Sequence, residues 1–538
     1  MKIRMMKKLL LVSMCIALTF TLSACGSNSK PTNTGTAAKK IVNIGIMNAP
    51  SGFNPLEWSD QAQNYMTGIL FQPLVELNDD MKFVPMLADS IETKDNQTFT
   101  IKLNPKAKWT DGKPITADDV IFTLNLISNP KVASSVASNF NLLEGLNDGG
   151  KNTTGGSISG VKKVDDRTLE FKTKKPVDLA LFMDGIGTRL KTVPAHVLKD
   201  VDPEKFYQNP FVQKPTVTSG PFKLVTFQKG QYVQLAANKD YFKGTPKLDE
   251  IYFKIMPGAN ITAQLQSGEI DMNEPNIGLI PFEDSDKVKG MANVTTDTKG
   301  LQSVIQTLMI NTTTITDVRV RKALSHAINR KLIIDNLLKG DGEAIELPYF
   351  SNSPFINKSI SMTPYDPEQA KQLLKEAGWD ANRVINFDVP SGNKVREQVA
   401  DIIVDNLKKV GLNVQIQKYD FVTSLAKAKK GEYDIYIVGI PQYPINPDVS
   451  NFLKTGGTLT LSKYSSPEMD ALLTSGANSV DPVQRKEIYN KVQEVFMKDL
   501  PSPTIYVQNA LKAVSKRLLV GKPKSFGMYI DVYLWDVQ

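Results

Sequence analysis

The side chains that most often carry catalysis or bind metals are scarce in this 538-residue sequence, which contains two histidines and two cysteines. His196 and His326 are far apart in the sequence. Neither histidine belongs to an HExxH or CxxC pattern that would bring metal ligands together. A structural role explains each of them better. We therefore expect no metal site and no cofactor.

Two short patterns have the look of functional motifs, and both are incomplete. Residues 145–152, GLNDGGKN, approach the spacing of a phosphate-binding loop but lack the serine or threonine that would ligate magnesium. Ser128 to Lys131 fits S-x-x-K only as a short pattern that recurs by chance. The sequence thus offers no nucleophile, no metal site and no cofactor loop, and we expect no enzymatic activity.

The N-terminal residues form a targeting segment. A basic start precedes an apolar run from Leu9 to Leu22, which is too short to favour a membrane-spanning helix. The run ends in LSAC, residues 22–25, which resembles a bacterial lipobox. We expect residues 1–24 to be removed and Cys25 to carry a lipid that anchors the protein to the outer side of the bacterial cell membrane. An ordinary secretory peptide or a marginal membrane anchor is the alternative.

The remainder of the chain is long enough for more than one lobe. Residues 26–40 contain no large apolar side chain and are expected to form a flexible tether. About 500 residues follow, which is more than one hydrophobic core normally organises. The net charge of +8 includes four basic residues of the leader. Because no basic run is interleaved with aromatic residues, we do not expect nucleic acid binding.

Residues 98–127 predict a strand, a turn and a helix in succession. Alternate residues of 98–103 are apolar, which is the period of a half-buried strand. Asp111 and Gly112 favour a turn. Thr116 can cap the following helix, whose apolar side chains recur on one face. Capping and turning explain the polar residues, so we do not expect them to touch a ligand.

Other segments carry clear signals for helix ends. Asp317, Asp366 and Asp481 can each cap a helix, and the last two precede a proline at the first helical position. Gly268 suits the left-handed residue that closes a helix. Residues 503–507 predict a strand that returns to the first lobe.

Several of these segments, in the same order, resemble the extracellular solute-binding proteins of ABC importers, in the peptide/nickel (oligopeptide-binding) family 5. The resemblance is carried by WTDGKP at 109–114, ADDV at 117–120, TSGPF at 218–222, QSGEID at 266–271 and DVRVRKAL at 317–324. It implies an α/β fold with two lobes of the periplasmic-binding-protein type (class II, cluster C) and an extra subdomain in the first lobe. It also implies that the chain crosses twice between the lobes.

With this resemblance, the chain is expected to divide as follows: 1–24 signal peptide, 25–40 tether, 41–84 first lobe, 85–210 extra subdomain, 211–300 first lobe, 301–500 second lobe and 501–538 first lobe again.

The resemblance also implies a function. The protein is expected to be the substrate receptor of an ABC importer, a monomer that closes its lobes around an oligopeptide or dipeptide. It would then present the peptide to a membrane permease and its ATPase subunits. One alternative is the same transport role for nickel, a metal chelate or another small solute. A second alternative is a surface peptide receptor in signalling.

The segment that holds the peptide's amino terminus in peptide-binding members corresponds here to residues 439–448, GIPQYPINPD. Tyr443 stands where that family has an aspartate, and Pro441 removes a backbone donor. Asp448 or Asp60 could bind the amino group instead, or the solute could be a metal chelate. The family resemblance favours peptides.

The remaining site residues are expected in the loop after the first strand and in the second lobe. Ligand clefts combine aromatic walls with a few placed polar groups. On that basis the candidate ligand-binding residues are Trp58, Asp60, Phe421, Tyr443, Asn446 and Asp448.

Overall fold

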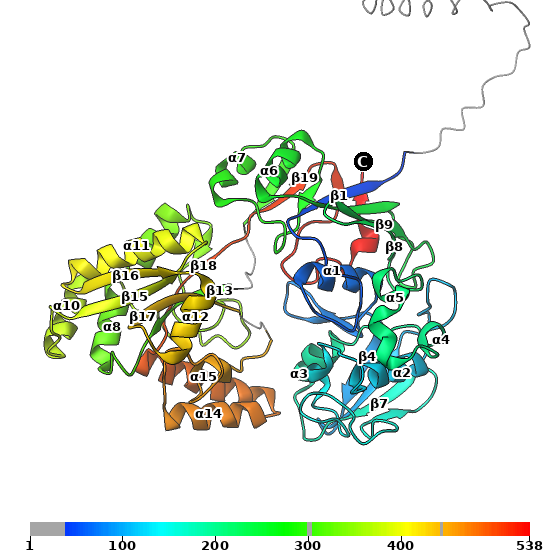
Figure 1. Cartoon of the computed structure of the whole chain (residues 1–538), viewed down its shortest axis with the longest axis horizontal. Coiled ribbons are helices and arrows are strands. Elements are labelled where there is room, and N and C mark those ends of the chain that lie inside the picture. Colours follow the sequence, from blue (N-terminus) through cyan, green and yellow to red (C-terminus); the bar gives the residue numbers. More distant parts are fainter. Residues whose placement is uncertain (1–37, 299–303, 442–444) are drawn as a thin grey trace, which may run out of the picture. The chain divides into compact units, whose positions relative to one another are not determined.

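The structure is a computed structural model, and it describes residues 38–298, 304–441 and 445–538 (Figure 1). The predicted signal peptide, Cys25, most of the tether and Tyr443 lie outside the described residues. Residues Lys40–Gln538 form one compact unit. Within this unit the strands form two large sheets and one smaller sheet, besides two pairs of short strands.

The first large sheet has seven strands in the order β12-β19-β11-β1-β10-β9-β8. Strand β1 pairs in parallel with both β10 and β11. Its residues Val42, Ile44 and Ile46 are fully buried in the largest hydrophobic core. Gly45, between them, faces α6 (Gly258–Ser267), because a Cβ there would lie 3.4 Å from the Ile261 Cγ1 atom of that helix. The strands are β1 (Ile41–Ile46), β8 (Phe222–Gln228), β9 (Tyr232–Ala237), β10 (Glu250–Ile255), β11 (Met272–Asn273), β12 (Val294–Asp297) and β19 (Lys512–Ser515).

A four-stranded antiparallel sheet lies inside the segment for which the extra subdomain was predicted. Its order is β4-β5-β7-β6, with β4 (Ala88–Thr93), β5 (Thr98–Leu103), β6 (Val161–Lys163) and β7 (Thr168–Lys172). The predicted strand, turn and helix of residues 98–127 are all present, the helix being α2 (Ala117–Ser128).

The polar residues of this signature have structural roles, as predicted. The Asp119 carboxylate accepts from the backbone N–H of Thr116 at 2.9 Å and from that of Ala195 at 3.0 Å. Asp111 pairs with His196 at 2.8 Å, so this histidine joins the signature turn to the start of α4 (Ala195–Leu198). These bonds explain the residue types without any ligand.

The second large sheet has six strands in the order β14-β18-β13-β17-β15-β16. Strand β17 is buried on both faces, because Ile435 and Ile437 belong to one core and Tyr436 and Val438 to another. Helices α8 (Val318–Ala327), α10 (Pro367–Glu376) and α11 (Lys394–Lys409) contribute to the first core and α12 (Phe421–Lys430) to the second, which is the layering of an α/β lobe with helices on both faces of its sheet. The strands are β13 (Val304–Ile310), β14 (Gly342–Glu343), β15 (Val384–Pro390), β16 (Asn413–Tyr419), β17 (Ile435–Pro441) and β18 (Thr504–Gln508).

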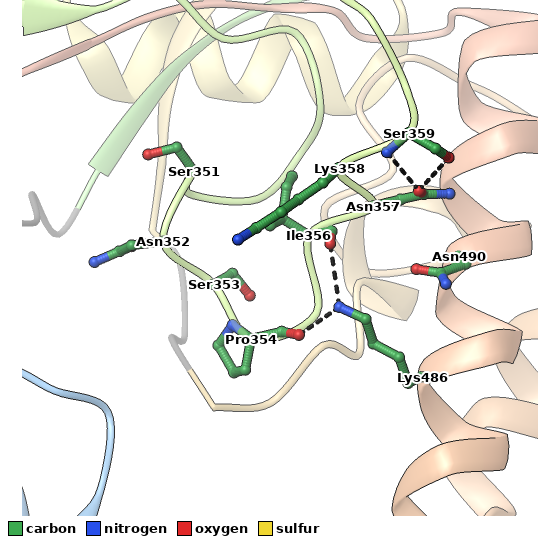
Figure 2. A pocket seen from close by; sticks show the side chains of 10 residues that line it. All are labelled: Ser351, Asn352, Ser353, Pro354, Ile356, Asn357, Lys358, Ser359, Lys486 and Asn490. Atoms are coloured by element: carbon green, nitrogen blue, oxygen red, sulfur yellow. Dashed lines mark hydrogen bonds between the residues drawn. The ribbon is translucent and has the colours of Figure 1, made fainter.

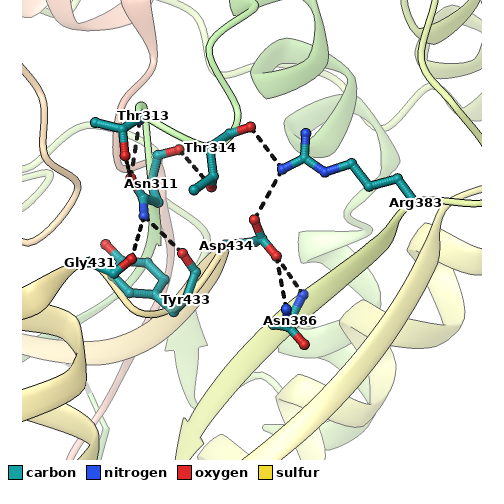
Figure 3. A network of polar contacts seen from close by, with 8 residues as sticks. All are labelled: Asn311, Thr313, Thr314, Arg383, Asn386, Gly431, Tyr433 and Asp434. Carbon is teal, nitrogen blue, oxygen red and sulfur yellow. Dashed lines mark hydrogen bonds and ion pairs between the residues drawn. The ribbon is translucent and has the colours of Figure 1, made fainter.

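A polar network fixes one end of this sheet (Figure 3). The Asp434 carboxylate accepts from Arg383 at 3.1 Å and from the Asn386 backbone N–H at 2.9 Å. The Asn311 amide donates to the carbonyls of Gly431 and Tyr433 at 3.0 and 2.9 Å. The ends of β13, β15 and β17 are therefore held in register at this edge.

One predicted boundary differs from the structure. Residues 503–507 were expected to return to the first lobe, but β18 pairs with β13 and β14 in the second sheet. The chain rejoins the first sheet only at β19. Alternation and length predict a strand equally well in either sheet, and the partner strands decide the assignment.

The helix-end signals are confirmed. Asp317, Asp366 and Asp481 accept backbone N–H bonds at 2.8, 2.9 and 2.7 Å and so begin α8, α10 and α15. Gly268 closes α6 with a φ of 77°. Among the described residues, no helix is long and apolar enough to span a membrane.

The helices are α1 (Gln61–Leu70), α2 and α4 as given above, α3 (Leu179–Phe182), α5 (Pro210–Gln213), α6 (Gly258–Ser267), α7 (Ser285–Lys289), α8 (Val318–Ala327), α9 (Arg330–Leu332), α10 (Pro367–Glu376), α11 (Lys394–Lys409), α12 (Phe421–Lys430), α13 (Ser450–Leu453), α14 (Pro467–Asn478) and α15 (Pro482–Asp499). The short remaining strands are β2 (Val75–Leu77), β3 (Phe83–Pro85), β20 (Leu518–Val520) and β21 (Asp536–Val537).

Candidate functional site

The predicted first-lobe residues Trp58 and Asp60 lie in the loop after β1, whose carboxyl end is next to that of the parallel strand β11. Two backbone bonds hold the segment after β11 against the end of β1: Glu274 N–H donates to the Gly45 carbonyl at 3.1 Å, and Met47 N–H donates to the Ile277 carbonyl at 2.7 Å. Open α/β sheets bind ligands outside the carboxyl ends of their strands. Residues 47–60 and 274–280 therefore form the candidate wall on this side.

Trp58 lies in this wall with its side chain partly open to solvent. Its backbone N–H donates to the Ser135 hydroxyl at 2.8 Å, and the Arg189 guanidinium lies 3.9 Å from the ring centroid. The residue is 38% exposed. Trp58 is thus an exposed and supported aromatic ring, as a ligand wall requires, while ligand contact itself stays a prediction.

Asp60 has a structural role that the sequence analysis did not identify. One carboxylate oxygen accepts from the Gln63 backbone N–H at 2.7 Å and caps α1, and the other accepts from the Ser51 backbone N–H at 2.9 Å. Both oxygens are therefore already bonded to the chain. Its predicted role as an ammonium partner stays untested, and the cap explains why an aspartate stands there.

Glu274 is a carboxylate at the same wall that the sequence analysis missed. Its Oε2 atom accepts from the backbone N–H groups of Asn276 and Ile277, both at 2.7 Å. Its Oε1 atom is buried and has no hydrogen-bond partner among the described residues. Burial raises the pKa of Glu274 to about 7. An acidic residue directly after a short buried strand was the available signal in the sequence.

On the second sheet, an arginine lies near the carboxyl end of β17. Arg396 Nε donates to Gln306 Oε1 at 3.0 Å, and a Cβ on Gly439 would lie 3.5 Å from an Arg396 terminal nitrogen. The neighbouring Glu397 pairs with Lys418 instead, at 3.0 Å. No carboxylate pairs with Arg396 among the residues that the structure describes. A half-buried guanidinium is therefore available for an anionic group.

Asn446 and Asp448 lie in one turn, in which the Asp448 backbone N–H donates to Asn446 Oδ1 at 3.1 Å. Asp448 Oδ1 accepts from the Ser450 backbone N–H at 2.9 Å at the start of α13, and Asn446 Oδ1 accepts from Arg485 at 3.3 Å. Arg485 is 2% exposed and lies over the rings of Phe355 and Tyr489. Arg485 is not among the predicted site residues, because α15 is distant in sequence from this turn.

The other two second-lobe candidates are less constrained. Phe421 is the first residue of α12 and is 50% exposed, with the preceding Asp420 as the helix cap. Tyr443 falls outside the described residues.

A cavity of about 250 Å³ lies where the chain passes between the two large sheets. Asn276 and Gln306 both line it. Asn276 donates its backbone N–H to Glu274 and Gln306 accepts from Arg396, so a carboxyl group and a guanidinium each lie directly behind a lining residue. The cavity combines amide and apolar side chains, and its full lining is Pro275, Asn276, Leu279, Ile280, Phe282, Ser285, Val304, Gln306, Asp341, Gln508, Asn509, Ala510 and Leu511.

The described residues contain no group of three or more histidine, cysteine, aspartate and glutamate side chains arranged to hold a metal ion. The glycine-rich stretch at 145–152 has a structural explanation. Its Lys151 ammonium donates to the carbonyls of Ile127 and Val132, both at 2.8 Å, and closes the end of α2.

Comparison with known families identifies the class of protein. The family described as bacterial extracellular solute-binding proteins, family 5, matches residues 82–460. The chain therefore belongs to this family, as its signature segments predicted. Its members are solute-binding proteins that act outside the cytoplasm.

Three relatives show the range within this family. The chain is 28% identical over 539 residues to the oligopeptide-binding protein AppA of Bacillus subtilis, covering 95% of each chain. The solved structure of AppA with a nonapeptide covers 93% of this chain and 99% of its own, with a TM-score of 0.69 and 26% identity.

The substrate-binding protein CtaP of Listeria monocytogenes has a TM-score of 0.79 and 26% identity, covering 93% of this chain and 99% of its own. A heme-binding protein A of Haemophilus influenzae is 27% identical, covering 90% of this chain and 91% of its own. Relatives of similar identity are thus named for different ligands.

Proposed function

We propose that this chain is the substrate-binding protein of an ABC importer and that it captures peptides for a membrane permease. The observation that carries the proposal is its likeness to the oligopeptide-binding AppA along nearly the whole of both chains. The topology supports the mechanism. The chain crosses between the large sheets twice, between Asp297 and Val304 and between Gln508 and Lys512, and paired crossings can act as a hinge for closure around a ligand.

The cavity at these crossings suits the backbone of a peptide. Gln306 and Asn276 contribute amide groups that can donate and accept hydrogen bonds. Leu279, Val304 and Leu511 contribute apolar contact. Peptide backbones need both donors and acceptors, and the apolar groups exclude water around them.

The two charged groups behind this lining match the two ends of a peptide. Glu274, whose Oε2 atom accepts from the Asn276 backbone N–H, has a second carboxyl oxygen without a partner among the described residues, and the Arg396 guanidinium donates to Gln306. An ammonium group could bind the former and a carboxylate the latter. Glu274 would then do what the aspartate expected at position 443 does in peptide-binding members, alongside the earlier candidates Asp448 and Asp60.

Calorimetry with end-blocked peptides tests this proposal. For the wild type, amidation of the peptide's carboxyl terminus should weaken binding by about 2–5 kcal/mol, the cost of removing one partner of a buried charge pair. In Arg396→Gln the same amidation should change little, since the partner is already gone. Arg319→Gln is the matched control, because Arg319 is exposed and pairs with Asp317 at the surface.

Failure of every peptide to bind would contradict the proposed function. Binding that is insensitive to amidation in both proteins would contradict only the role of Arg396. The amino terminus of the peptide is tested in the same way. The effect of its acetylation on binding is compared in the wild type and in Glu274→Gln, Asp448→Asn and Asp60→Asn.

A metal chelate or heme is the second candidate ligand, because the heme-binding relative is as similar as the peptide-binding ones. Native mass spectrometry of protein from its own host separates the two, since the mass of a retained ligand distinguishes a peptide from a metal complex. Visible absorbance reports heme directly. A signalling receptor would be favoured if deletion of the gene changed signalling and left peptide uptake intact.

The proposal includes the finer features expected from the sequence. The protein is a monomer without catalytic activity, is anchored through Cys25, and delivers its solute to a permease with ATPase subunits. Intact recovery of bound peptides after long incubation supports the absence of catalysis. Peptide hydrolysis that persists through purification and disappears in His196→Ala or His326→Ala would contradict it.

A further inference from the structure

A second cavity, of about 560 Å³, is lined only by residues of the second lobe, and none of them lines the cavity at the crossings. Its volume falls in the range of small-molecule sites. Figure 2 shows the loop 351–359 curving around it, with α15 on the other side. The lining is Ser351, Asn352, Ser353, Pro354, Ile356, Asn357, Lys358, Ser359, Lys486 and Asn490.

The loop is held in one conformation by α15. The Asn357 backbone N–H donates to Gln493 Oε1 at 2.8 Å, and Gln493 Nε2 donates back to the Phe355 carbonyl at 2.9 Å. Gln493 is fully buried. Asn357 Oδ1 in turn accepts from the Ser359 backbone N–H at 3.1 Å. The cavity wall is therefore built before any ligand arrives, which lowers the entropic cost of binding.

The charged groups of the lining are both positive. Lys486 donates to the carbonyls of Pro354 and Ile356, the latter at 3.1 Å, which uses two of its three N–H donors. Lys358 is exposed at the cavity and can meet a ligand from solvent. Neither ammonium pairs with a carboxylate among the described residues, and no acidic residue lines the cavity. The burial of Lys486 and the charge of Lys358 lower the pKa of Lys486.

The uncharged residues of the lining favour a ligand that also carries hydrogen-bond donors. Asn490 Oδ1 is a buried acceptor without a partner among the described residues, and Figure 2 draws this amide oxygen on the side of the cavity where Ile356 and Lys486 lie. A buried acceptor gains most from a ligand that carries its own donor. The serine and asparagine side chains around the cavity can bond to hydroxyl groups of the same ligand.

We infer that this cavity is a binding site for the phosphate monoester of a small polyol, separate from the solute site at the crossings. The phosphate oxygens accept from Lys358 and from the remaining donor of Lys486, and a ligand hydroxyl donates to Asn490 Oδ1. Bare phosphate or sulfate would satisfy the charges alone, and a neutral polyol would satisfy the hydroxyl partners alone. The site therefore needs both parts in one molecule.

Calorimetric titration of the full-length protein with glycerol 3-phosphate tests the inference. Glycerol 3-phosphate should bind at least about tenfold more tightly than inorganic phosphate, sulfate or glycerol, a difference of about 1.4 kcal/mol. Lys358→Gln should lower this affinity by about tenfold or more, because a charged hydrogen bond is lost, and Lys358→Arg should retain most of it. Asn490→Asp keeps the side-chain size and should lower the affinity further, since it places a negative charge beside the phosphate.

Lys491→Gln is the matched control, because Lys491 is the next residue of α15, is exposed and does not line the cavity. The affinity of Lys491→Gln for glycerol 3-phosphate should stay within about twofold of the wild-type affinity, as expected for a screened surface charge. An equal loss in Lys491→Gln, or equal binding of sulfate and glycerol 3-phosphate, would reduce the site to unspecific attraction and overturn the inference. So would the absence of binding by the folded wild type. Because these titrations contain no peptide, their outcome is independent of the proposed transport function.

Discussion

Carboxylates at the candidate site differ in what their oxygens are bonded to. Asp60 caps α1 and binds a loop N–H, and Asp448 begins α13. Glu274 differs from both, because it is fully buried and its Oε1 atom has no hydrogen-bond partner among the described residues. Buried groups with unused bonding capacity are costly for stability. The unpaired oxygen of Glu274 therefore lowers the stability of the fold, and the same oxygen would be the one that binds a ligand.

The first prediction follows from the raised pKa of Glu274. Its pKa is about 7 in the folded protein against an ordinary value of 4.5, so the folded state holds the proton more tightly. The free energy of unfolding should therefore fall as pH rises from about 4.5 through 7. Glu274→Gln stays neutral, so its free energy of unfolding should rise relative to that of the wild type by about 2–3 kcal/mol between pH 5 and pH 8.

Urea denaturation of both proteins at the two pH values measures this difference. Other titrating groups, including Asp388 with a pKa raised by burial to about 6, are shared and cancel in the comparison. Parallel pH profiles for wild type and variant would rule out the buried, proton-holding state of Glu274.

At the scale of elements, helix caps position the loops that carry the site. Asp60 sets the start of α1 and therefore the path of the loop that presents Trp58. Asp119 has the larger role, because it joins the start of α2 to the start of α4. Its side chain is buried. This part of the family signature thus has a structural role, because it connects two helices.

The second prediction concerns the connection that Asp119 makes between these helices. Asp119→Ala removes the acceptor of two backbone N–H groups and should destabilise the protein by about 3 kcal/mol, since each buried unpaired donor costs about 1–3 kcal/mol. Asp118→Ala is the control. Asp118 is two-thirds exposed and pairs with Lys163 at the surface, so its loss should cost less than about 1 kcal/mol. Equal shifts of the melting temperature in the two variants would contradict the role of Asp119.

For the whole molecule, two sheets joined by paired crossings predict a response to ligand. A peptide present at about 100 times its Kd should raise the free energy of unfolding by about 2.7 kcal/mol. Closure should also lower the radius of gyration measured by small-angle X-ray scattering while circular dichroism stays unchanged. A rise in stability without any change in the radius of gyration would favour binding without lobe closure.

The last prediction concerns attachment of the whole molecule to the membrane. Because LSAC at residues 22–25 ends a short apolar run, globomycin should cause an uncleaved precursor to accumulate, and detergent should be needed to extract the wild type. Cys25→Ser should remain unprocessed. Normal processing and membrane retention of Cys25→Ser would exclude a lipid on this residue.

The sequence by itself determined the elements and the family. Aspartates at 317, 366 and 481 and the pattern of 98–127 predicted helix starts and a strand that the structure contains, because caps and periodicity depend on neighbours within a few residues. The segments that resemble the family lie in fixed register along the chain. They were sufficient to predict two lobes and a solute-binding role.

Only the tertiary structure decided which groups meet. It placed β18 in the second sheet and brought Arg485 into contact with Asn446, 39 residues away in the sequence. It also showed which atoms of Glu274 and Arg396 are hydrogen-bonded. Strand pairing and the burial of a charge depend on residues far away in the chain. An acidic residue in a sequence does not tell whether both of its oxygens will be bonded, as in Asp60, or one will stay without a partner among the described residues, as in Glu274, and only packing distinguishes the two cases.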